Sequence, residues 1–180
     1  KRVFRGTSER LGSGLLAIFH RAKMTERRPN LDDQTLQCKS AIAAGDFVKA
    51  DVLARTIATT NPTSVDAYNL IGNVAIRTGT AENAARWFGV AIRLDNLKTV
   101  GPRLNRAMAL EMAGRSEEAF SGYKALHDEH PDHPKIKEKL ARSLYERAEH
   151  KECLEIIETI QTLSFDHYYM RGRCRLELGR

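Results

Sequence analysis

Apolar residues recur at helical spacing through most of the chain, and the clearest example is the stretch from Tyr68 to Asp95. Its apolar positions return every three to four residues on both sides of a short turn, Thr78-Gly79-Thr80. A glycine at such a turn can take the left-handed conformation that ends a helix. The stretch therefore predicts two amphipathic helices joined as a hairpin.

The hairpin pattern repeats along the chain, and three kinds of residue keep its register. They are the turn residue, a small residue early in the second helix, and a residue that marks the end of the unit. The turn residues are Gly45, Gly79, Gly114 and Ala148, the small residues are Ala50, Ala84, Ala119 and Cys153, and the end residues are Pro62, Asn96, Pro131 and Phe165. Each set is spaced by 34, 35 and 34 residues. One hairpin is too thin to bury its own apolar faces, so this period predicts an all-α solenoid of stacked hairpins.

Small residues are also expected in the first helix of each hairpin, where the two helices cross closely. This crossing position holds Cys38, Gly72, Ala107 and Ala141. Cys38 and Cys153 both occupy such packing positions, so we interpret them as inert core thiols and not as nucleophiles. Trp87 is interpreted as a packing residue between units or a half-exposed ring.

These positions make the sequence similar to the tetratricopeptide repeat family, whose pattern is an aromatic residue, Leu-Gly, Tyr, Ala-x-x-x-Phe and Pro. The best match carries Tyr68, Ile71-Gly72, Ala84 with Phe88, and Ala91, whereas Arg103 and Arg106 occupy apolar positions of the next unit. The resemblance implies a right-handed α-solenoid with repeats at about 31–64, 65–98, 100–133 and 134–164 and a partial unit at 165–180. That last stretch is either a terminal capping helix or the first helix of a repeat that continues beyond residue 180, and its closing Leu-Gly-Arg favours the second.

Residues 1–30 form a separate basic arm. They hold eight Lys or Arg residues and two acids, whereas residues 31–180 hold 21 of each sign, so the arm accounts for the net charge of +6. Leu11, Leu15, Ile18 and Ala22 predict a short amphipathic helix over residues 9–24, followed by a linker that contains Pro29. This helix either caps the first repeat, packs elsewhere in a longer protein, or binds an anionic membrane surface; a flexible tail is the remaining alternative.

Charge and motifs exclude several classes of function. The neutral balance of the repeats argues against nucleic acid binding. Three cysteines without metal-type spacing indicate a reducing, cytoplasmic compartment, and residues 1–30 leave open a place at the periphery of a membrane. His127, His130 and His133 are interpreted as part of an exposed turn and not as a metal site. No nucleophile elbow or phosphate loop is present, so we expect neither catalysis nor a cofactor.

The family resemblance implies that the first helices line a concave groove for a peptide or helix of a partner. Carried onto this chain, the groove residues are Thr35, Lys39, Ile42, Asn69, Asn73, Ile76, Arg77, Leu104, Met108, Glu111, Met112, Lys135, Glu138, Arg142, Tyr145, Tyr169 and Arg173. Some family members hold a C-terminal carboxylate with a clamp of Lys, Asn and Arg side chains. Asn73, Asn105, Lys135 and Lys139 stand in matching positions, although Asn69 replaces the first Lys of the clamp and Lys139 replaces its Arg.

The best interpretation is a non-catalytic protein–protein interaction scaffold. An ordinary solvated inner face without a dedicated ligand is the plainer alternative. The chain is otherwise the recruiting segment of a larger enzyme, such as a transferase continuing beyond residue 180, or an assembly factor that uses its basic arm at a membrane. Self-association through the exposed ends of the repeat array is a further possibility.

Overall fold

The computed structural model describes residues 30–179, so the helix expected over residues 9–24 lies outside the described residues. The described part is helical and contains no strand. Its helices, in chain order, are α2 (Leu31–Ala44), α3 (Phe47–Thr60), α4 (Val65–Arg77), α5 (Ala81–Asp95), α6 (Val100–Met112), α7 (Ser116–Glu129), α8 (Pro134–Glu146), α9 (His150–Glu158) and α10 (Phe165–Glu177). The expected all-α fold class is confirmed.

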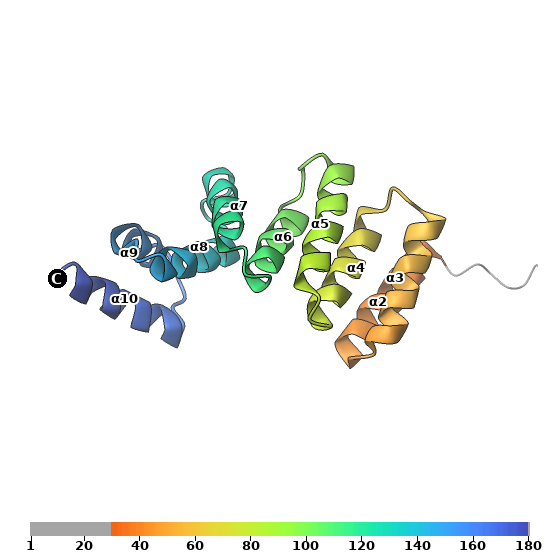
Figure 1. The fold of residues 1–180 in the computed structure, drawn as a ribbon, viewed down its shortest axis with the longest axis horizontal. Coiled ribbons are helices and arrows are strands. Elements are labelled where there is room, and N and C mark those ends of the chain that lie inside the picture. The colour runs from red at the N-terminus through yellow and green to blue at the C-terminus, as the bar shows by residue number, and fades with distance from the viewer. Residues whose placement is uncertain (1–29, 180) are drawn as a thin grey trace, which may run out of the picture.

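Consecutive helices pair as hairpins and the hairpins stack in chain order. Figure 1 shows an elongated array with α2 and α3 at one end and α10 at the other. Within it, α2 packs on α3, α4 on α5, α6 on α7 and α8 on α9, and each hairpin contacts the next. Helix α10 packs on α9 and α8. The array is therefore an all-helical solenoid. Within residues 30–179, no helix is both long and apolar enough to cross a membrane.

The turns between the helices of a hairpin share one backbone geometry. Gly45, Gly79 and Gly114 have φ values of 79°, 77° and 78°. The residue after each glycine donates its N–H to a carbonyl in the last turn of the first helix, as Thr80 does to Ala75 at 2.8 Å. The fourth turn keeps this pattern with an alanine, because Ala148 has φ 60° and Glu149 donates to Leu144 at 2.9 Å. This turn position therefore adopts the left-handed backbone conformation whether glycine or alanine occupies it.

The small residues early in the second helices are closely packed, as the spacing predicted. Ala50, Ala84, Ala119 and Cys153 are each at most 1% exposed. A Cβ atom added to Gly72 would lie 2.6 Å from the ring of Phe88, so the hairpin of α4 and α5 has no room for even a methyl group there. Phe88 is itself fully buried. The Phe88 ring can therefore pack against the backbone of α4 only because residue 72 has no side chain.

Two buried cysteines each bridge the helices of an outer hairpin, namely Cys38 at the crossing position of α2 and Cys153 early in the second helix α9. The Sγ of Cys38 donates to the carbonyl of Ala50 at 3.3 Å, and that of Cys153 donates to the carbonyl of Ala141 at 3.2 Å. Burial raises the pKa of Cys38, and burial followed by the contact with Cys174 raises the pKa of Cys153 to about 12. Both thiols therefore stay protonated at neutral pH, which is unfavourable for nucleophilic chemistry.

Phe165, which the sequence pattern placed at the end of the fourth unit, lies at the boundary with the next helix. Helix α9 already ends at Glu158, and Phe165 is the first residue of α10. The residues after Glu158 include Thr159, Ile160 and Thr162, whose β-branched side chains disfavour a helix. Ser164 then starts α10, because its N–H donates to Nδ1 of His167 at 3.0 Å in a capping box. The last helix consequently begins earlier than the period of the preceding units predicts.

We predict opposite effects for alanine at Gly72, which lies at the crossing position of α4, and at Gly172, which is exposed in α10. Gly72→Ala should lower the free energy of unfolding by about 1–3 kcal/mol, because the new methyl group overlaps the Phe88 ring. Gly172→Ala in α10 should raise it by about 0.5–1 kcal/mol, since no atom lies within 4 Å of the added Cβ and alanine favours a helix. Urea denaturation of the two variants measures both changes, and equal effects would contradict the close crossing of α4 and α5.

We also predict that Ala148→Gly stabilises the array. Relief of the left-handed strain exceeds the extra entropy of glycine in the unfolded chain, which should raise the free energy of unfolding by about 0.5–1 kcal/mol. Ala125→Gly, at an exposed position inside α7, is the matched control and should lower it by a similar amount. A loss of stability in both variants would show that Ala148 is not strained.

Candidate binding surface on the first helices

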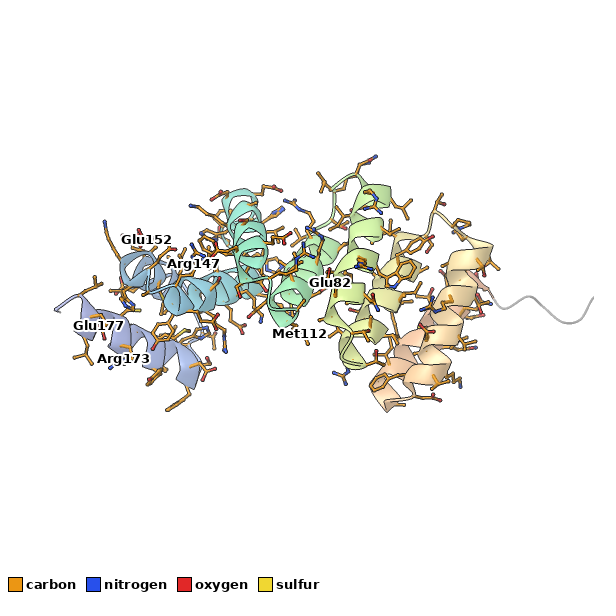
Figure 2. The ribbon with its side chains drawn as sticks, in the orientation of Figure 1. Glu82, Met112, Arg147, Glu152, Arg173 and Glu177 are labelled. Atoms are coloured by element: carbon orange, nitrogen blue, oxygen red, sulfur yellow. The ribbon has the colours of Figure 1, made fainter. Side chains whose placement is uncertain are left out.

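Most of the predicted groove residues are accessible on the first helices α2, α4, α6, α8 and α10, and we call these accessible residues the first-helix surface. The exposed members are Lys39, Arg77, Met112, Lys135, Tyr169 and Arg173. The half-buried members are Thr35, Ile42, Asn69, Asn73, Ile76, Asn105, Met108, Glu111, Glu138, Lys139, Arg142 and Tyr145. Figure 2 shows Met112 and Arg173 along the lower side of the array, with Arg147 and Glu152 toward the upper side.

Leu104 is the exception, because it is only 5% exposed and belongs to the hydrophobic core. It lies three residues before the crossing position of α6. The equivalent residues are Thr35, Asn69 and Glu138, which are half-buried, and Tyr169, which is 57% exposed at the end of the array. The position is therefore partly covered wherever a further helix follows, and Leu104 is the member that is fully covered. The side chain of Leu104 is therefore not part of the accessible surface.

Side chains of the first-helix surface join neighbouring helices. Tyr145 of α8 and Tyr169 of α10 meet edge to face, with ring centroids 6.4 Å apart. Beside them, Nη2 of Arg142 lies 2.9 Å from a carboxylate oxygen of Asp166. The structure thus brings Arg142, Tyr145 and Tyr169 together at the junction of α8 and α10, and the ring faces and guanidinium there offer apolar and cationic contacts side by side.

A second junction centres on Glu111, which connects α6 with α7 and α8. The hydroxyl of Tyr123 donates to Oε2 of Glu111 at 2.5 Å, and Nζ of Lys139 lies 3.3 Å from the same oxygen. Burial, followed by this hydrogen bond, raises the pKa of Tyr123, so the hydroxyl remains a donor. A carboxylate ligand in the proposed clamp would have to compete with Glu111 for Lys139. Lys135, by contrast, is exposed.

The departures from the family's aromatic position have a structural role. This position lies four residues before the crossing position, where Tyr68 stacks on Trp87 with ring centroids 6.0 Å apart. Arg103 instead makes two hydrogen bonds of 2.5 and 2.6 Å to the carboxylate of Glu129 at the end of α7. The hydrogen bond and charge of Arg103 lower the pKa of Glu129. Lys137, only 8% exposed, donates to the carbonyl of Thr159 after α9 at 3.4 Å. In these two hairpins, a cation of the first helix that reaches the C-terminal end of the second helix thus replaces the aromatic contact.

The histidine-rich segment is less exposed than expected. His127, His130 and His133 are half-buried, and Nδ1 of both His127 and His133 is buried without a hydrogen-bond partner among the described residues. Within residues 30–179 there is no group of three or more His, Cys, Asp or Glu side chains placed to hold a metal ion.

Two cavities contain residues that the sequence pattern did not single out for binding. One, of about 380 Å³, lies between α3, α4 and α5, and Arg55 covers the Trp87 ring at its edge at 5.8 Å from the centroid. The other, of about 320 Å³, lies between α5, α6 and the start of α7 and is lined by Arg86, Arg93, Arg106 and Arg115 with Ala85, Gly89, Val90 and Leu110. No predicted groove residue lines either cavity. The sequence signal for the second was Arg106, which occupies an apolar position of the repeat pattern.

Known structures with the same architecture are tetratricopeptide repeat proteins. MamA superposes with a TM-score of 0.70 at 16% identity, covering 79% of this chain and 84% of MamA. YrrB, described as a TPR protein with an unusual peptide-binding site, gives a TM-score of 0.70 at 12% identity, covering 88% and 82%. TTC0263, a thermophilic TPR protein of Thermus thermophilus, gives 0.65 at 18% identity, covering 95% and 97%. No family model and no curated protein matches the sequence. The described residues therefore have the tetratricopeptide repeat fold.

We predict that Tyr123→Phe lowers the free energy of unfolding by about 1–2 kcal/mol, because it removes the hydrogen bond to the Glu111 carboxylate. Tyr145→Phe is the matched control: its half-buried ring contacts Tyr169, and no hydrogen bond of its hydroxyl is found among the described residues. Thermal denaturation of both variants tests the difference. A larger loss for Tyr145→Phe would mean that the Glu111 junction does not stabilise the array.

Proposed function

We propose that this protein is a non-catalytic interaction scaffold whose first-helix surface binds a peptide or helix of a protein partner. One observation carries the proposal. The residue directly after the crossing position is accessible in all five first helices, as Lys39, Asn73, Met108, Arg142 and Arg173. The crossing residue that precedes it is small and buried in α2, α4, α6 and α8. A continuous row of accessible and chemically varied side chains thus runs beside the packed crossings, which suits recognition more than packing.

The chemistry of the first-helix surface indicates the kind of partner. Met108 and Met112 provide flexible, polarisable apolar contacts near the middle of this surface. Tyr145 and Tyr169 add aromatic surface toward α10, and Lys39 and Lys135 add exposed cations. Such a surface fits an amphipathic segment that presents apolar side chains together with acidic ones. The peptide-binding site named for YrrB supports this use of the fold.

The test is a selection of binding peptides from a random library, followed by measurement of their affinities. The double variant Lys39→Glu/Lys135→Glu should weaken the selected acidic peptides at least tenfold, because two exposed cations of the first-helix surface become anions. The matched control is Lys49→Glu/Lys151→Glu, which makes the same change of charge on the second helices α3 and α9. Fluorescence polarisation gives the dissociation constants, and circular dichroism verifies that both variants are helical.

Equal affinity of the wild type and the first-helix variant would reject the proposed surface. Equal weakening by the two double variants would also reject it, because binding would then follow the net charge of the whole chain and not one face.

A further inference from the structure

Two arginines converge in the cavity between α5, α6 and α7. A Cβ atom placed on Gly89 of α5 would lie 3.7 Å from Nη1 of Arg93 and 3.9 Å from Nε of Arg106. Arg93 comes from α5 and Arg106 from α6, so the two guanidinium groups approach the same point from different hairpins. Gly89 leaves this point free of a side chain. We call the surface formed by Arg86, Arg93, Arg106 and Arg115 around Gly89 the arginine cavity.

Arg93 and Arg106 differ from the other arginines of residues 30–179. Each of the others has a carboxylate within 4.0 Å or covers an aromatic ring, whereas Arg93 and Arg106 have neither such partner among residues 30–179. The paired arginines are Arg55, Arg86, Arg103, Arg115, Arg142, Arg147, Arg173 and Arg175, and those over rings include Arg77 and Arg171. The two arginines without a compensating partner in this part of the chain are thus the two that lie beside Gly89.

This arrangement is unfavourable for the isolated chain. Like charges held near each other repel, and Arg106 is half-buried, where solvent screens the repulsion less. The family pattern has an apolar residue at the position of Arg106, which shows that stacking itself does not need a cation there. An anion between the two guanidinium groups would remove the repulsion.

We propose that the arginine cavity binds a phosphate monoester carried on a side chain of a protein partner. A guanidinium group offers planar paired donors that match the oxygens of a phosphate. A phosphorylated side chain carries nearly two negative charges at neutral pH and so neutralises both uncompensated arginines, whereas one carboxylate would neutralise only one. The missing side chain at Gly89 provides space for the group.

The surroundings favour a single compact anion over an extended one. Glu82, labelled in Figure 2, lies 2.9 Å from Arg115 and 4.0 Å from Arg86, and Glu118 lies 2.6 Å from Arg115. These carboxylates limit the positive charge to the centre of the cavity. A nucleic acid backbone or an anionic membrane would meet them at the rim. The site is separate from the first-helix surface, so the inference does not depend on the proposed function.

The first experiment tests the cavity with inorganic phosphate. Phosphate should raise the thermal midpoint of the wild type above that in sodium chloride of equal ionic strength. Arg93→Gln and Arg106→Gln should each abolish this rise, whereas Arg55→Gln, which removes an arginine already paired with Asp51, should retain it. Both cavity variants should fold at least as well as the wild type without phosphate, because each removes the repulsion. No difference between phosphate and chloride, or the same rise in all four proteins, overturns the proposal.

The second experiment identifies the carrier of the phosphate. A peptide library with one fixed phosphoserine should bind the wild type at least tenfold more tightly than the same library with serine, and Arg93→Gln should remove the difference. The first-helix variant Lys39→Glu/Lys135→Glu should keep the preference for phosphoserine, which separates this site from the proposed peptide surface. Equal binding of both libraries overturns the inference. Arginine-dependent flotation with vesicles of phosphatidic acid, without a preference for phosphoserine peptides, also overturns it and assigns the cavity to a membrane.

Discussion

Close contact between the two helices of each hairpin is the constraint on which the rest of the array depends. The Phe88 ring lies where a side chain at Gly72 would otherwise be, and Ala84 and Ala91 beside it are fully buried. Dispersion contacts fall off steeply with distance, so a pair of helices held apart by a methyl group would lose much of this packing. The hairpin is the smallest unit that can stack, and stacking supplies its remaining buried surface.

The same constraint determines which side chains are available for recognition. A residue at the crossing position must be small and buried, and the residue after it then points away from the crossing. This alternation produces a row of accessible or half-buried side chains, such as Asn73, Met108 and Arg142. Their chemistry differs from one hairpin to the next while the hairpin geometry stays the same, which is the basis for proposing a partner-binding role.

Charged residues contribute in two different ways within this fold. At the aromatic position, Arg103 and Lys137 contact groups at the ends of α7 and α9, so their charges replace an aromatic contact within a hairpin. Arg106 has no such partner among the described residues and lies with Arg93 beside Gly89, at the junction of two hairpins. A cation in an apolar position of the repeat thus has a structural role at Arg103 and Lys137. Packing gives no reason for the cation at Arg106. That contrast is the reason for assigning a ligand to the arginine cavity.

Spacing along the chain was enough to predict the helical hairpins, the left-handed turns at Gly45, Gly79 and Gly114 and the buried small residues, because helix periodicity and glycine conformation are local properties. The end of α9 at Glu158 was not predicted, because the spacing of the repeats marks the boundary of a unit and not the last residue of its second helix. Tertiary structure alone decided that Leu104 is buried, that Lys139 contacts Glu111, and that Arg93 and Arg106 converge at Gly89. Each of these features depends on how one hairpin packs against its neighbour. The sequence determines which face of a helix a side chain occupies, whereas the neighbours of that face depend on the distance and angle at which hairpins stack.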